Sequence, residues 1–317
     1  MLGGRPAAGQ LHGGDVIFPS MATALLILPN FVLILVGLLL ARRFDFGRDF
    51  WDGLEKLVYY VLFPALLFRS LVLARIDFGA TGMLVLAALG FTLAGFALSL
   101  LAGPLFRLDR KLLATGSQCG YRFNTYVGLA IAGSLFGTSG VALAALLLGV
   151  MIPLANFLAV AMLAAHGKRG FLYELATHPL LVSSLAGLAW NAAGLPLPGF
   201  ADQTLNLLAV TALPAGLLSV GAAMRIERGQ GAAPAHAWWL AVKLLAVPAI
   251  AWGTILAAGF AGVEARVLLL CAALPTASNA YILAVRMTGD GRAVATQITL
   301  GTALSMLTIP LWMSLAL

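Results

Sequence analysis

The stretches GYRFNTYVGLA (residues 120–130) and LPTASNAYILA (residues 274–284) each set polar side chains inside a long apolar segment. Both contain an asparagine, at Asn124 and Asn279, followed two residues later by a tyrosine. The chain is 61% hydrophobic and 10% charged, whereas soluble domains carry roughly 25% charged residues. Apolar runs of about 20 residues, enough to cross a hydrocarbon layer of about 30 Å, recur along its length. These features predict an all-α integral membrane protein.

Composition also excludes several classes of function. The net charge of +7 does not indicate nucleic-acid binding, since no Lys/Arg cluster is interleaved with aromatic residues. Cys119 and Cys271 lie in apolar segments without metal-ligand spacing, as small buried residues do, so we expect no metal and no cofactor. Intramembrane catalysis needs a nucleophile with a base, paired aspartates or metal ligands. The four histidines fall in loops or near segment ends, away from acidic partners, so an enzyme is not expected: His12, His166, His178 and His236.

Charged or Gly/Pro-rich breaks divide the chain into ten predicted membrane spans. Residues 1–20 are expected to form a disordered leader, with Met21 as an alternative start. No insertion is long enough for a separate soluble domain. The predicted spans are 21–41, 54–74, 80–105, 112–136, 139–165, 171–193, 203–224, 237–260, 264–286 and 292–316.

The loop charges predict the orientation of these spans. Thirteen Lys and Arg residues lie in the loops that follow odd-numbered spans, and four lie on the opposite side. Because basic loop residues stay cytoplasmic, both termini should be non-cytoplasmic. We therefore expect a multi-pass protein of the cell (inner) membrane, with the lipid bilayer as its partner.

An internal repeat relates the two halves of the chain, residues 21–165 and 166–317. Five spans per half is an odd number, so the second half must be inverted, as in many secondary transporters. Pro and Gly are common in membrane helices, which weakens each match taken singly but not their shared order. The matches, at offsets that grow from 150 to 157, are Pro29 with Pro179, Gly37 with Gly187, Pro64 with Pro214, Asn124 with Asn279, and Pro153 with Pro310.

Both polar stretches are predicted to break their helices near the middle of the membrane. Asn124 lies about twelve residues into span 4, or roughly 18 Å at 1.5 Å per residue. Pro275 removes a backbone donor and disfavours helix at the preceding residue, while Gly120 and Gly128 loosen span 4. We expect the two broken helices to cross and to present half-helix N-termini, which suit an anion.

The predicted substrate-binding residues lie in these two stretches. Arg122 is costly near the bilayer centre, which suggests function, and its planar fork suits a carboxylate. Alternatively, it is a structural arginine that binds carbonyls freed by the break, and the asparagines are interhelical hydrogen-bonding groups. The predicted set is Arg122, Asn124, Thr125, Pro275, Thr276, Ser278 and Asn279.

Five further polar residues are weaker candidates. Tyr126 and Tyr281 are expected mainly to pack. Lys243 is expected to snorkel to the cytoplasmic surface from near Trp238 and Trp239. The remaining two are isolated polar residues that would line a cavity: Asn156 and Gln297.

With these motifs in hand, the chain resembles the auxin efflux carrier family of membrane transporters over nearly all of residues 21–317. The specific parts are the two polar stretches, the terminal TLGTALSMLTIPLW (299–312) and LVYYVLFPALLF (57–68). The resemblance implies ten spans in two inverted repeats. It also implies a scaffold, often dimeric, from spans 1, 2, 6 and 7, and a transport domain from spans 3–5 and 8–10.

The resemblance further implies elevator-type transport of organic anions, with Asn124 as the asparagine associated with carboxylate binding. Phe123 stands where plant carriers have proline, and the large cytoplasmic loop of many plant members is absent, so auxin is a poor candidate. We expect a permease or efflux carrier for a small carboxylate, with a possible homodimer.

Other transport mechanisms stay open at this point. A sodium-coupled symporter of the bile-acid type shares the crossed helices but usually needs a carboxylate near the crossover. The acidic residues here fall in loops or at span edges, which also disfavours proton coupling, so facilitated diffusion fits best. A channel would require a repeated pore ring, which the sequence does not contain.

Overall fold

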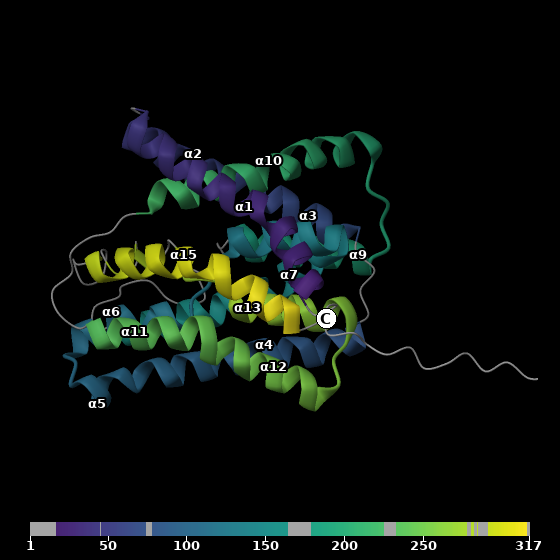
Figure 1. Ribbon diagram of the computed structural model, residues 1–317. Coiled ribbons are helices and arrows are strands. Elements are labelled where there is room, and N and C mark those ends of the chain that lie inside the picture. The colour runs from purple at the N-terminus through teal and green to yellow at the C-terminus, as the bar shows by residue number, and fades with distance from the viewer. Residues whose placement is uncertain are drawn as a thin grey trace, which may run out of the picture.

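The computed structural model describes residues 17–44, 46–73, 78–163, 179–224, 233–277, 280–281, 284 and 291–315. Within these ranges every regular element is a helix (Figure 1). In the first half the helices are α1 (Ile17–Arg43), α2 (Arg48–Leu57), η1 (Val58–Leu62), α3 (Phe63–Val72), α4 (Phe78–Leu100), α5 (Ala102–Phe106), α6 (Arg110–Ser117), η2 (Gln118–Gly120) and α7 (Thr125–Leu163). In the second half they are α9 (Pro179–Ala192), α10 (Gly199–Ala223), α11 (Ala233–Ala241), η3 (Val242–Ala246), α12 (Val247–Ala258), α13 (Gly262–Ala273) and α15 (Arg292–Leu315).

Five helical segments in the described part of the chain are long and apolar enough to cross a membrane. Helical residues fall within each of the ten expected ranges, while the number of crossings stays a prediction. Helix α1 begins at Ile17, inside the range expected as a leader, and residues 1–16 lie outside the described residues. The five segments are Gly82–Phe106, Arg110–Ala159, Gly199–Ala223, Ala233–Ala258 and Val294–Leu315.

Two short π-helices, η1 and η3, each lead into a proline near the start of the next helix. Pro64 and Pro248 lack a backbone N–H, and their rings clash with the carbonyl four residues earlier. A π-helical turn accommodates this by widening the helix locally. For Pro248 that carbonyl belongs to Leu244, and the indole Nε1 of Trp312 donates a hydrogen bond to it at 2.9 Å. The proline is therefore accommodated without an unpaired carbonyl.

Small residues bring α1 against α10 and α3 against α9, in the upper part of Figure 1. Gly37 lies against the backbone of Leu218, and Gly221 lies against the backbone of Ile34. A Cβ at Gly187 would lie 2.8 Å from the carbonyl oxygen of Phe68. Close approach of backbones at small residues is the usual mode of helix packing in membranes, so these four helices form one closely packed group.

Helices α4, α11 and α12 form the lower part of Figure 1, together with α5 and α6. The last carbonyls of α4 have no partner within the helix. Trp238 Nε1 donates to the carbonyl of Leu98 at 2.9 Å, and Trp239 Nε1 donates to that of Ser99 at 3.0 Å. The two tryptophans thus satisfy the end of α4 and fix α11 beside it.

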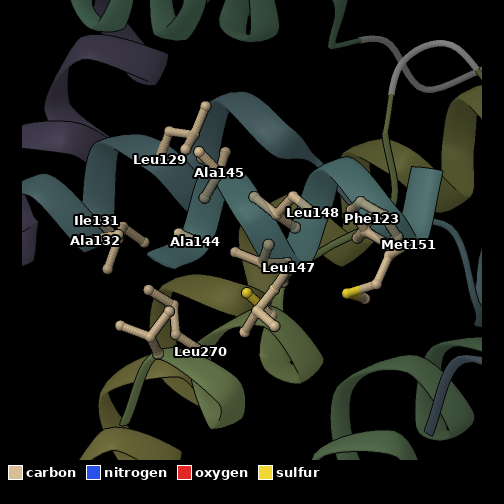
Figure 2. Close-up of a cluster of buried hydrophobic side chains, with 14 of the residues drawn as sticks. Phe123, Leu129, Ile131, Ala132, Ala144, Ala145, Leu147, Leu148, Met151 and Leu270 are labelled. Atoms are coloured by element: carbon tan, nitrogen blue, oxygen red, sulfur yellow. The ribbon is translucent and has the colours of Figure 1, made fainter. Parts of the chain in front are cut away.

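Helix α7 is a helical hairpin, because its two halves meet at Gly137. Gly137 has φ 62° and ψ −151°, a conformation that is essentially restricted to glycine. Figure 2 shows Leu129 of the first half beside Ala145 of the second, within the buried core that also holds Leu270 of α13. Residues at similar distances on either side of Gly137 therefore face each other, which positions the candidate site.

Replacing Gly137 with alanine is expected to lower the free energy of unfolding by about 1–3 kcal/mol. No atom lies within 4 Å of the position that its Cβ would take, so the loss would be backbone strain alone. Thermal unfolding in detergent measures the effect. Gly90→Ala is the control, since Gly90 is helical and its Cβ position is also open, and alanine is favoured in helices. Equal stability of the two variants would contradict the hairpin geometry.

Candidate functional site

The first polar stretch forms a break between α6–η2 and α7. Residues Tyr121–Asn124 are not helical, and Asn124 caps the helix that follows. Its Oδ1 accepts hydrogen bonds from the backbone N–H groups of Tyr126 at 3.0 Å and Val127 at 3.2 Å. An asparagine is among the best N-cap residues because its side chain satisfies donors that have no partner inside the helix. Asn124 therefore ends the break and begins α7.

The second polar stretch ends α13, as the sequence predicts. Leu274 adopts φ −62° and ψ 141°, which is the extended conformation favoured before a proline. Leu274–Ala277 are not helical and are buried. The predicted site residues Ser278 and Asn279 lie outside the described residues.

Hydrogen bonds join the two breaks directly. The backbone N–H of Asn124 donates to the carbonyl of Pro275 at 2.7 Å. The hydroxyl of Thr276 donates to the carbonyl of Cys119 at 2.6 Å. Gly128 makes room for this contact, because a Cβ there would lie 2.6 Å from Cδ1 of Leu274. The structure thus brings Asn124, Pro275 and Thr276 together, although they lie some 150 residues apart in sequence.

Arg122 is the buried cation of the first break, with 4% of its surface exposed. Its Nη1 donates to Oε1 of Gln118 at 3.2 Å, and its Nη2 donates to Oδ1 of Asn156 at 3.0 Å. These partners are neutral amides, so they orient the guanidinium without neutralising its charge. Asn156 reaches Arg122 because the hairpin at Gly137 folds the second half of α7 back over the first.

A small cavity of about 20 Å³ adjoins this arginine. Such a volume accommodates about one water molecule. Thr125 contributes to the wall, next to the N-terminus of α7. The cavity is lined by Arg122, Phe123, Thr125, Ile152, Ala155 and Asn156.

Lys243 does not snorkel to the surface, so that expectation is wrong. The residue lies in η3 and is 2% exposed, and its Nζ donates to the carbonyl of Ala272 at 3.1 Å. Ala272 belongs to the last turn of α13, where carbonyls lack helical partners and a cation is favoured. The distance of Lys243 from the end of its span did not indicate this contact, because that distance does not show that the side chain points towards the helix bundle.

The remaining candidates have other partners. Gln297 is buried, and its Nε2 lies 2.9 Å from Nδ1 of His236 on α11. Tyr126 stacks on Phe63, with ring centroids 4.6 Å apart. Tyr281 packs against the buried cluster that contains Cys119 and Trp239. The packing role expected for the two tyrosines agrees with these contacts, and the substrate-binding roles stay predictions.

The structure also assigns roles to groups that sequence reasoning missed. Gln118 binds Arg122, and its position four residues earlier in the same polar stretch was an available signal. The backbone carbonyls of Cys119 and Pro275 carry no sequence signal at all. In the part of the chain that the structure describes, no three His, Cys, Asp or Glu residues gather at one place as metal ligands would.

Replacing Thr276 with valine is expected to lower the free energy of unfolding by about 1–3 kcal/mol, because the buried carbonyl of Cys119 would lose its partner. The matched control is Thr254→Val, whose hydroxyl bonds only the carbonyl of Ile250 in its own helix. Thermal unfolding in detergent compares the two. A Thr276 variant as stable as the control would show that this bond does not hold the breaks together.

Comparison with known proteins places these features in a family. A family model described as "Membrane transport protein" matches residues 23–170 and again residues 167–313. The chain therefore belongs to this family of transmembrane transporters, the auxin efflux carrier family.

Two relatives resemble the chain over most of its length. A protein of Rhizobium meliloti (strain 1021) named "Putative malonate transporter" is 26% identical over 297 residues, which cover 90% of this chain and 92% of the relative. An "Uncharacterized transporter" of Methanothermobacter thermautotrophicus (strain Delta H) is 26% identical over 299 residues, covering 90% of this chain and 96% of the relative.

Proposed function

We propose that the chain is a secondary transporter for small organic anions, and specifically for carboxylates, which bind where the two breaks meet. The observation that carries the proposal is the buried guanidinium of Arg122, whose recorded partners among the described residues are the neutral amides of Gln118 and Asn156. The N-terminus of α7 begins three residues later and favours negative charge. An arginine fork beside a helix N-terminus suits a carboxylate.

Malonate is the first substrate to test, because the name of the Rhizobium relative specifies it. A short dicarboxylate carries two groups that a planar guanidinium recognises. The cavity beside Arg122 accommodates about one water, so the breaks must open before such an anion enters. The described conformation therefore corresponds to a closed site.

The proposed mechanism is an elevator, in which a transport domain moves against a scaffold. The scaffold comprises α1, α2–α3, α9 and α10, and the transport domain comprises the helices of spans 3–5 and 8–10. Reciprocal packing of α1 on α10 and of α3 on α9 supports an inverted repeat, since it pairs span 1 with span 7 and span 6 with span 2.

The test is uptake by the purified protein in proteoliposomes, with a panel of radiolabelled mono- and dicarboxylates. The expected result is saturable uptake of short dicarboxylates above that of empty liposomes. Imposed Na⁺, H⁺ and voltage gradients then identify the coupling. Absence of uptake for every carboxylate, by protein whose folding is confirmed, would contradict the anion proposal.

A further inference from the structure

Helix α7 of the proposed transport domain packs against α1, α3 and α10 of the proposed scaffold. Its first turn carries Tyr126, whose ring stacks on Phe63 at the start of α3. The ring centroids are 4.6 Å apart, and the interplanar angle is 19°. Phe63 is fully buried, so its ring is held by the packing around it. The stack therefore joins the transport domain to the scaffold.

Gly216 of α10 makes room for this stack from a second scaffold helix. A Cβ at Gly216 would lie 2.9 Å from the ring of Phe63 and 3.4 Å from Cγ of Tyr126. The first distance is shorter than the separation of about 3.5–4.0 Å that carbon atoms favour. The ring of Tyr126 thus occupies a slot that a phenylalanine and a glycine of the scaffold form together.

The backbone joins the same tyrosine to the site where the two breaks meet. Oδ1 of Asn124 accepts a hydrogen bond from the N–H of Tyr126 at 3.0 Å. The N–H of Asn124 donates in turn to the carbonyl of Pro275 at 2.7 Å. The cavity beside Arg122 accommodates about one water, so an anion enters only after these segments move. A displacement of Asn124 relative to the scaffold pulls the ring of Tyr126 along its slot.

We propose that Tyr126 is a positioning residue for the anion site, because its ring, held by Phe63 and Gly216, keeps the first break closed against the scaffold. This inference rests on the function and the mechanism proposed above. Loss of one aromatic pair shifts an equilibrium between a closed and an open form by about twofold to tenfold. Only the open form accepts the anion, so the apparent affinity rises in proportion to the open fraction.

Kinetics of uptake in proteoliposomes test this role, with the carboxylate that the panel identifies. For Phe63→Leu and for Tyr126→Leu we expect KM to fall by about twofold to tenfold, with a smaller change in kcat. The double variant should have the KM of either single variant, since both substitutions remove the same stack. A merely structural role would reduce the amount of active protein, which lowers the maximal rate and leaves KM unchanged.

A matched pair of glycine variants tests the slot from its other side. Gly216→Ala crowds the stack and should lower KM in the same way. Gly253→Ala is the control, because Gly253 lies in α12 and no atom lies within 4 Å of its Cβ position, so its KM should equal that of the wild type. Unchanged or raised KM for the ring variants and for Gly216→Ala would overturn the proposal.

Cysteine labelling measures the opening without any need for transport. Ala155 is 4% exposed and lines the cavity beside Arg122. The rate at which N-ethylmaleimide labels Ala155→Cys, measured by peptide mass spectrometry, should rise about twofold to tenfold when Phe63→Leu is added. An equal labelling rate would overturn the positioning role. Absence of carboxylate uptake by the wild type, with labelling accelerated as expected, would contradict the transport function and leave the closing role of the stack supported.

Discussion

Replacing Arg122 with glutamine is expected to lower carboxylate uptake by about tenfold to a hundredfold at subsaturating substrate, because hydrogen bonds to a charged group contribute about 1.5–3 kcal/mol. Glutamine keeps an amide that can bond Gln118 and Asn156 but has neither the charge nor the fork. Uptake by Arg122→Lys should lie between that of the wild type and that of Arg122→Gln, since lysine retains the charge without the planar geometry. Initial rates of uptake in proteoliposomes measure both variants.

The matched control for this prediction is Arg110→Gln, since Arg110 is an exposed arginine at the start of α6. Its uptake should stay near the wild-type value. Near-normal uptake by a folded Arg122→Gln protein would mean that the guanidinium is structural, holding the first break to the second half of α7 through Asn156.

Replacing Asn124 with aspartate is expected to lower uptake by at least about a hundredfold. The free energy of unfolding should stay within about 0.5 kcal/mol of the wild-type value. Aspartate is as good an N-cap as asparagine, and its charge is favoured at a helix N-terminus. The cap of α7 therefore survives, whereas a fixed negative charge occupies the place proposed for the substrate anion. Uptake and thermal unfolding of the same preparation measure the two effects.

The counterpart Asn124→Ala separates the roles further. It should lose about 1 kcal/mol of stability with the cap and should not introduce repulsion, so its uptake should exceed that of Asn124→Asp. If Asn124→Asp instead transports like the wild type, Asn124 is a helix cap alone, and the anion does not bind near it.

Much of the fold could be predicted from the sequence because its signals are local. Pro275 shows where α13 must end, and Gly137 falls in the gap predicted between spans 4 and 5. Both residues act through their own backbone restrictions. The extended conformation at Leu274 follows from the next residue alone.

The contacts of the site depended on tertiary packing, which the sequence does not show. The partner of Thr276 is a backbone carbonyl, and that of Lys243 is another, at the end of α13. The prediction for Lys243 was wrong because it rested on how far the residue lies from the end of its span, whereas the side chain points into the helix bundle. The contact of Phe63 with Tyr126 is a ring stack between helices that are distant in sequence, so neither residue gave a signal on its own.

A cryo-electron microscopy structure in lipid nanodiscs would show whether one anion binds where the two helix breaks meet. The sample would contain the carboxylate with the highest uptake at a saturating concentration. We expect carboxylate density between the guanidinium of Arg122 and the N-terminus of α7, with the contacts to Gln118 or Asn156 released. Substrate density elsewhere, with Arg122 still bonded to both amides, would contradict it.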